Sequence, residues 1–285
     1  MIATLDALLE TVRSGTGAMV VVEGETGQDA PWYYSQWFGD IAREVRFVHQ
    51  DGYLLVKKAV AYLREHAPIR PVFGLIDRDF TSRDETDASD PLESGLHRTG
   101  WYTLENYFLA DASAWLRILH MLSAGAPASG WATVEDIHAR IHDAYRLSLP
   151  VAAWNLVVHA ECRRIDSNAG SPGFREHHDA INEKTLASLT RWGDARSAPA
   201  SLHDLYRARL DELTALSPDA WPEHVTGKAV FKRFAEDFPE LRNTHNKYVK
   251  LARLYIAQQP PQPPDLAAIV DEIRREAAKL RRPGT

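Results

Sequence analysis

Acidic residues follow two short apolar runs near the start of the chain, at the points where these runs end. Glu23 comes directly after the run at 18–22, and Asp77 and Asp79 follow the run at 71–76. If the runs are strands of one parallel sheet, their carboxyl ends share an edge, where ligands of such sheets gather. Clustered carboxylates repel one another unless a proton or a cation neutralises them. Their oxygens suit Mg²⁺ or Mn²⁺, so these acids predict a divalent metal site.

A metal at this edge would be suited to the chemistry of phosphate esters. It can polarise a phosphoryl oxygen, orient the attacking nucleophile and stabilise the leaving oxygen. Gly24 follows Glu23 directly and would let the chain turn sharply and a phosphate approach the backbone. Arg78 lies between the two Asp residues, and on a strand its side chain would point the other way. We therefore expect Arg78 to form a structural ion pair.

The elements that position these acids form an α/β pattern over the first 110 residues. Runs rich in branched and aromatic residues predict strands at 18–22, 45–48, 71–76 and 101–104. Helical spacing of apolar residues predicts helices at 32–42 and 53–66. Strands that alternate with helices imply a parallel sheet flanked by helices. We therefore predict an α/β catalytic core over residues 1–110.

The pattern beyond residue 111 is helical. Sequences typical of helix starts occur at 133–136 and 201–204, and helices are predicted at 145–164, 175–191, 226–237, 247–258 and 266–280. We therefore predict a mainly α-helical region over residues 111–285. Basic residues gather late in it, and phosphate contact requires Lys and Arg. We expect residues 222–256 to fold back over the acids, with substrate contacts at Lys232, Arg233, Lys247 and Lys250.

Composition indicates an ordinary globular protein. Of 285 residues, 45% are hydrophobic and 25% charged, and the net charge of −6 argues against a nucleic-acid coat protein. No apolar stretch approaches the roughly 18 residues that suggest a membrane span. The single cysteine, Cys162, excludes an internal disulfide and a thiolate metal site. We expect a cytoplasmic protein with no membrane segment.

The acidic motifs and their order resemble the TOPRIM domain of topoisomerases, primases and overcoming-lysogenization-defect (OLD) type nucleases. The resemblance is closest to the TOPRIM nuclease subunits paired with ABC-type ATPases in PARIS-type antiphage defence systems. It covers about residues 18–110 and one later motif. The sequences that carry it are Val22-Glu-Gly24, the aromatic stretch at 32–38, Gly74-Leu-Ile-Asp-Arg-Asp79, Tyr102-Thr-Leu-Glu-Asn106 and Gly227-Lys228.

The resemblance implies a TOPRIM-like fold and a Mg²⁺- or Mn²⁺-dependent endonuclease. Its metal ligands would be Glu23, Asp77 and Asp79. Glu23, Glu105 and Lys228 would be catalytic residues: Glu105 as a further ligand or an orienting group, and Lys228 as a cation that neutralises charge in the transition state. Nucleic acid would be the substrate, either DNA or RNA, with tRNA among the candidates. The resemblance also implies a role as a toxic effector in antiviral defence, an ABC-type ATPase partner that gates the activity, and a homodimer.

One position departs from the family pattern. TOPRIM nucleases usually carry a second acid four residues after the first Glu, where this chain has Gly27. Asp29 could take that role after a short insertion, or Glu25 could. A mechanism with a single metal is the remaining option.

Two other functions compete with a nuclease. The sequence Asp77-Arg-Asp-Phe-Thr81 fits the nucleophile motif of haloacid-dehalogenase-type phosphatases, in which Asp77 would attack phosphorus and Asp79 would act as acid and base. That motif usually opens its fold, whereas here two predicted strands and Glu23 precede it. The other option is a non-catalytic module that has a TOPRIM-like fold and binds a protein partner.

Overall fold

The chain forms two compact units, each made of segments that are distant in sequence. The computed structural model describes residues 4–24, 30–41, 44–80, 95–123, 128–165, 177–195, 201–239 and 247–280. The first unit comprises Met1–Gly100, Ser113–Ile118 and His245–Thr285, and the second comprises Trp101–Ala112 and Leu119–Thr244. The sequence prediction drew one boundary near residue 110. In the structure, the last two helices belong to the unit that contains the acids.

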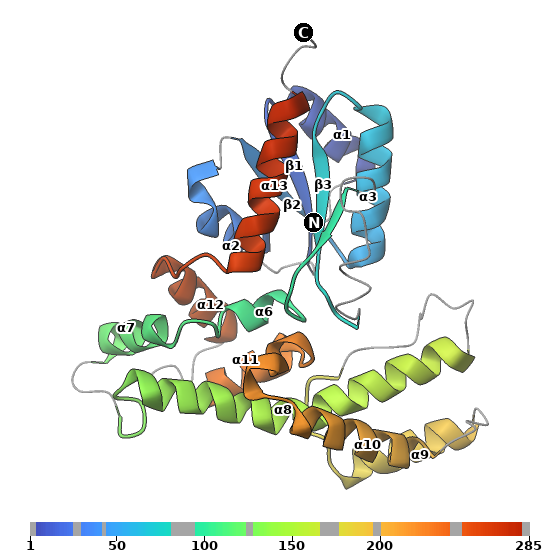
Figure 1. Ribbon diagram of the computed structural model, residues 1–285, viewed down its shortest axis with the longest axis vertical. Coiled ribbons are helices and arrows are strands. Elements are labelled where there is room, and N and C mark those ends of the chain that lie inside the picture. Colours follow the sequence, from blue (N-terminus) through green and yellow to red (C-terminus); the bar gives the residue numbers. More distant parts are fainter. Residues whose placement is uncertain are drawn as a thin grey trace. The chain divides into compact units, whose positions relative to one another are not determined.

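A parallel sheet forms the centre of the first unit (Figure 1). Within the described residues it has four strands in the order β2-β1-β3-β4. The strands are β1 (Ala18–Glu23), β2 (Val45–Gln50), β3 (Val72–Ile76) and β4 (Leu96–Arg98). Val22 of β1 pairs with Leu75 of β3. The end of β1 at Glu23 therefore lies beside the end of β3, which Asp77 follows directly. The predicted parallel α/β sheet flanked by helices is confirmed.

Helices cover both faces of this sheet. On one face, α1 (Leu5–Ser14) and α3 (Tyr53–His66) pack against a buried cluster that includes Val21 and Ile76. On the other face, the rings of Tyr34 in α2 (Ala30–Trp37) and Phe47 in β2 are stacked. Strands β1 and β3 are buried on both faces, which explains why their sequences are continuous apolar runs.

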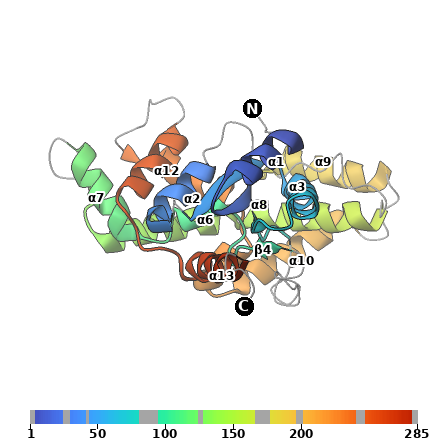
Figure 2. The same cartoon turned by 90° about the horizontal axis from the view of Figure 1, so that it is seen from above.

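The C-terminal helices α12 (Lys247–Ala257) and α13 (Pro264–Leu280) are part of the first unit. Tyr255 of α12 stacks on Trp115, with 5.1 Å between the ring centroids. Asp265 of α13 accepts a hydrogen bond of 2.8 Å from the backbone N of Gly100. Figure 2 shows α13 and α1 on opposite sides of the sheet.

A buried histidine lies between the sheet and α13. The Nδ1 atom of His97 in β4 lies 4.0 Å from Oε2 of Glu272. Burial lowers the pKa of His97, and the carboxylate of Glu272 opposes this effect. His97 is therefore a neutral packing residue of the sheet face at neutral pH.

The strand predicted at 101–104 is wrong. The fourth strand is β4, and residues 101–103 instead lead into the short helix α6 (Leu104–Tyr107). The ring of Trp101 stacks on Tyr107, and its backbone N donates to the Tyr107 hydroxyl. The backbone N of Tyr102 donates to the carbonyl of Pro222. The aromatic residues that suggested a strand therefore pack against other elements. Their backbone N–H groups donate hydrogen bonds to Tyr107 and Pro222 and not to a neighbouring strand.

All regular elements described beyond residue 111 are helices, as predicted. They are α7 (Ala112–Leu122), α8 (Val134–Ile165), α9 (Glu183–Ala195), α10 (Leu202–Ala215), η2 (Pro218–Glu223), α11 (Gly227–Asp237), α12 and α13. Both predicted helix starts are capped: Asp136 N donates to Thr133 Oγ1, and Asp204 N donates to Ser201 Oγ. Helix α8 starts at its cap, earlier than predicted, and α9 starts later than predicted. No helix in the described ranges has the length and apolar character needed to cross a membrane.

Candidate functional site

The structure brings Glu23 and Asp77 together at the carboxyl edge of the sheet. Glu23 is the last residue of β1, and Asp77 follows β3 directly. Oε2 of Glu23 accepts a hydrogen bond of 3.1 Å from the backbone N of Asp77. Both side chains are half-buried, so they remain accessible at the edge. The sheet therefore places the Glu23 carboxylate against the backbone of Asp77, although the two residues are 54 positions apart in sequence.

The chain turns sharply immediately after Asp77. Asp79 has a φ of 47°, which lies in the left-handed region that residues other than glycine seldom adopt. The preceding residue, Arg78, is buried, and its backbone N donates to Thr99 Oγ1. Its Nη1 atom donates a 2.9 Å hydrogen bond to the carbonyl of Gly100. Arg78 therefore anchors the turn through hydrogen bonds. The ion pair expected from the sequence stays a prediction.

The donor set at this edge suits Mg²⁺ only in part. Mg²⁺ is commonly held by one or two carboxylates, water and substrate phosphates, and Glu23 and Asp77 are carboxylates of this kind. No group of three or more His, Cys, Asp and Glu side chains within the described ranges is arranged to hold a metal ion. Glu25 and Asp29 lie outside the described residues. The site predicted from Glu23, Asp77, Asp79 and Asp29 therefore stays a prediction.

Gly24 allows a close approach at the same edge. Its backbone N donates to the carbonyl of Gln50 in β2, with a length of 3.1 Å. A Cβ atom added to Gly24 would lie only 3.2 Å from the Cβ of Ala30, the first residue of α2. The missing side chain thus lets the start of α2 pack directly beside the end of β1. Contact between Gly24 and a phosphate stays a prediction.

Sequence reasoning missed the contribution of β2 to this edge. It ended the strand at Val48, whereas β2 continues to Gln50, which pairs with Glu23. Asp51 follows, and the Nε2 atom of His49 is buried without a hydrogen-bond partner among the described residues. The only signal was a His-Gln-Asp sequence before a glycine, which is too common in turns to be informative.

In the second unit, the two remaining motifs of the resemblance contact each other. The backbone N of Gly227 donates to Thr103 Oγ1 over 3.2 Å, although these residues are 124 positions apart. Nδ2 of Asn106 donates to the carbonyl of Val225. A Cβ atom at Gly227 would lie 2.4 Å from the backbone N of Asn106, so only glycine allows this contact. Helices α6 and α11 therefore join at Thr103, Asn106 and Gly227.

The predicted catalytic residues Glu105 and Lys228 occupy this joint. Both are half-buried, Glu105 in α6 and Lys228 in the first turn of α11. The Oε2 atom of Glu105 is buried and has no hydrogen-bond partner among the described residues. Such an unsatisfied group is unusual and is often functional. The predicted approach of Lys228 to Asp77 concerns residues of different units and stays a prediction.

The basic residues predicted to bind substrate are divided between the units. Lys232 and Arg233 lie on α11, and Nζ of Lys232 forms a 2.7 Å ion pair with Asp179. This hydrogen bond lowers the pKa of Asp179 and raises the pKa of Lys232. Lys247 and Lys250 lie on α12, in the same unit as Glu23 and Asp77. Their contact with substrate stays a prediction.

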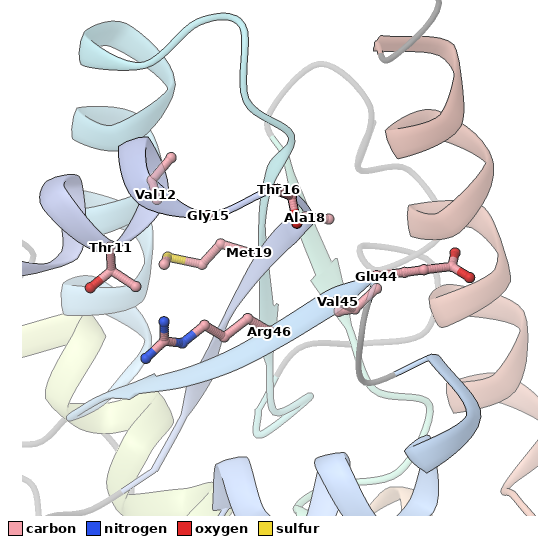
Figure 3. Close-up of a pocket in the computed structure, with 10 residues that line it drawn as sticks. Thr11, Val12, Gly15, Thr16, Ala18, Met19, Glu44, Val45 and Arg46 are labelled. Carbon is pink, nitrogen blue, oxygen red and sulfur yellow. The ribbon is translucent and has the colours of Figure 1, made fainter.

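A hollow of about 210 Å³ lies at the opposite end of the sheet (Figure 3). It is lined by the end of α1 and by the first residues of β1 and β2, with Met19, Glu44 and Arg46 among them. Glu44 and Arg46 are exposed, and the acids Glu23 and Asp77 are not part of its wall. The hollow is therefore separate from the candidate site.

Comparison with known proteins finds no protein-family model that matches the chain and no curated protein that is significantly similar to it.

Proposed function

We propose that this chain is a Mg²⁺-dependent nuclease of the TOPRIM type, which hydrolyses phosphodiester bonds of nucleic acid. The observation that carries the proposal is the contact of the Glu23 carboxylate with the backbone of Asp77. This contact joins the carboxyl ends of adjacent parallel strands. Ligands bind at this edge in sheets of this class.

The residues at this edge suggest how a metal would be held. Glu23 and Asp77 would supply oxygen ligands, and Asp79 would add a third. The ion would polarise a phosphoryl oxygen and stabilise the leaving oxygen. The left-handed backbone of Asp79 supports this assignment, because strained residues cluster at functional sites. Arg78, which is hydrogen-bonded to Gly100, would keep the turn rigid.

The second unit supplies further candidates for catalysis. Glu105 would orient a ligand or the attacking water, which its unsatisfied buried oxygen supports. Lys228 would stabilise negative charge in the transition state. Both roles depend on the prediction that residues 222–256 fold back over the acids. The role in antiviral defence, the gating ATPase partner and the homodimer form part of the proposal through the resemblance alone.

A phosphatase is the second candidate because Asp77 and Asp79 stand directly after a buried strand, as that class requires. In a phosphatase, Asp77 would attack phosphorus and form a covalent aspartyl-phosphate. The position of Glu23 favours the nuclease, because a phosphatase of this type gives it no essential role.

Cleavage assays on the full chain test the choice between these functions. Labelled single-stranded DNA, duplex DNA, RNA and tRNA would each be incubated with Mg²⁺, with Mn²⁺ and with EDTA. We expect cleavage of at least one substrate with either metal and none with EDTA. Hydrolysis of p-nitrophenyl phosphate without nucleic-acid cleavage, together with trapping of beryllium fluoride at Asp77, would identify the phosphatase instead.

A further inference from the structure

Four exposed side chains form a continuous surface on the first two turns of α3. Tyr53 is 43% exposed and Leu54 is 56% exposed, and the side chains of Lys57 and Lys58 are exposed as well. Side chains three or four positions apart in a helix are neighbours on its surface. Lys57 therefore lies beside both Tyr53 and Leu54, and Lys58 lies beside Leu54. We call these four residues the α3 surface.

The α3 surface is held outward because the other side of the helix is buried. Val56, Ala59 and Val60 belong to the cluster that lies between α3 and the sheet. A Cβ atom added to Gly74 of β3 would lie 3.0 Å from Val56 Cγ1 and from Val60 Cγ2, so this side of α3 packs directly on the strand. Among the described residues, none of the four surface side chains takes part in a hydrogen bond, an ion pair or a ring contact. Their polar and aromatic groups can therefore engage a ligand.

The α3 surface lies close to the carboxyl edge of the sheet. Gln50, the last residue of β2, pairs with Glu23, and Tyr53 begins α3 only three positions later. Consecutive Cα atoms are about 3.8 Å apart, so the Cα of Tyr53 is within about 11 Å of that of Gln50. Figure 1 shows α3 alongside the strands, in the same unit as the acids. The first turn of α3 is therefore a neighbour of Glu23.

The Glu23 side chain lies on the same face of the sheet as α3. Met19 and Val21 of β1 belong to the buried cluster that α1 and α3 cover. Side chains alternate between the two faces along a strand, so Glu23, two positions after Val21, lies on the face that α3 covers. A chain bound on the α3 surface can therefore reach Glu23 without passing around the sheet.

The chemistry of the α3 surface fits an unpaired strand of nucleic acid. Lys57 and Lys58 are adjacent cations in a chain whose net charge is −6, and the one acid of α3, Glu65, comes two turns later. Phosphates supply the complementary charge. Tyr53 and Leu54 add an aromatic ring and an apolar side chain at the end nearer the acids. An unpaired strand presents the faces of its bases to such side chains, whereas a duplex keeps them stacked inside.

We propose that the α3 surface binds an unpaired strand of nucleic acid and directs it to Glu23. A base would stack on the ring of Tyr53 and contact Leu54, while Lys57 and Lys58 would contact phosphates. This inference deepens the proposed nuclease function by naming the form of its substrate. It rests on that function for the destination of the strand, whereas binding is measured separately from cleavage.

Binding of fluorescein-labelled 20-nucleotide oligothymidine and oligouridine to the full chain tests the inference. Fluorescence anisotropy in EDTA measures affinity without metal-dependent cleavage. We expect Tyr53→Ala to weaken binding by about 5- to 100-fold, the loss expected when one base–ring stack is removed. Tyr53→Phe keeps the ring and should bind like the unaltered chain. Ile69→Ala removes a 79%-exposed side chain beyond the other end of α3 and should also bind normally. Circular dichroism would establish that each variant is folded.

Salt dependence separates stacking from charge contacts. Lys57→Gln and Lys58→Gln should each reduce the slope of log affinity against log salt by about 0.7, because each loses one phosphate contact to a single strand. Tyr53→Ala should leave this slope unchanged. Arg13→Gln is the matched control, because Arg13 donates to the carbonyl of His66 at the opposite end of α3. It removes one positive charge and should change neither affinity nor slope.

Unchanged affinity in Tyr53→Ala, unchanged slopes in both lysine variants, or equal affinity for a 20-base-pair duplex would overturn the inference. Loss of self-association in Tyr53→Ala without loss of oligonucleotide binding would also overturn it, because the α3 surface would then bind a second copy. If the variants lose binding as expected but the chain cleaves nothing with Mg²⁺ or Mn²⁺, the inference stands and the nuclease fails. If the chain cleaves nucleic acid and the variants bind normally, the nuclease stands and the inference fails.

Discussion

Glu23→Gln should lower nucleic-acid cleavage by about 10³-fold while leaving the fold intact. The Gln side chain keeps an oxygen that can accept the hydrogen bond from Asp77 N, so the strand ends stay joined. It removes the negative charge on which the proposed metal binding depends. A metal supplies several kcal/mol of transition-state stabilisation, and each 1.36 kcal/mol corresponds to about a tenfold change in rate.

Glu44→Gln is the matched control for this experiment. Glu44 is an exposed acid at the other end of the sheet, where its carbonyl accepts from Ala18 N. This variant should cleave at the normal rate. Gel assays with Mg²⁺ would give the rates, and a phosphatase assay would be run on the same samples. Cleavage by Glu23→Gln at the rate of the unaltered chain would show that Glu23 is not part of the active site. The phosphatase interpretation would then be favoured.

Asn106→Ala should destabilise the second unit by about 2–4 kcal/mol. The Asn106 side chain is fully buried, donates to the Val225 carbonyl and accepts a 2.7 Å hydrogen bond from the Tyr145 hydroxyl. Burial raises the pKa of Tyr145, so the hydroxyl stays protonated and remains a donor. The alanine variant leaves two buried polar groups unsatisfied, at about 1–3 kcal/mol each. Urea unfolding followed by circular dichroism measures the loss.

A double-mutant cycle separates the contribution of the Tyr145–Asn106 hydrogen bond from that of side-chain packing. Tyr145→Phe should cost about 1–2 kcal/mol, because it leaves Asn106 Oδ1 without its donor. The variant with both substitutions should lose less than the sum of the single losses, by about 1–2 kcal/mol. Strictly additive losses would show that the two side chains do not stabilise each other in solution.

The strands and their shared edge could be predicted because their physical causes are local. The runs that became β1 and β3 are apolar and branched, as expected of strands buried on both faces. Parallel strands place their carboxyl ends at one edge, so the meeting of Glu23 and Asp77 followed from the fold class. The helix starts at Thr133 and Ser201 were equally predictable, because capping depends on residues three positions apart.

Other features depend on contacts that no local pattern shows. β4 has only three residues, Leu96–Arg98, and its sequence contains no apolar run. The aromatic residues at 101 and 102 favour a strand by their residue type. In the structure, Trp101 instead stacks on Tyr107, and the backbone N of Tyr102 donates to the carbonyl of Pro222. The contact of Gly227 with Thr103 spans 124 positions. The division of α11 and α12 between units likewise results from packing rather than from composition.

Titration calorimetry with Mn²⁺ on the full chain tests the central claim, a metal bound by the acids at the carboxyl edge of β1 and β3. Asp77→Ala keeps the backbone N–H that holds Glu23 and removes only the proposed ligand. We predict saturable Mn²⁺ binding in the unaltered chain and in Glu44→Ala, and its loss in Asp77→Ala. Binding in Asp77→Ala that equals that of the unaltered chain would contradict the metal site and the nuclease built on it.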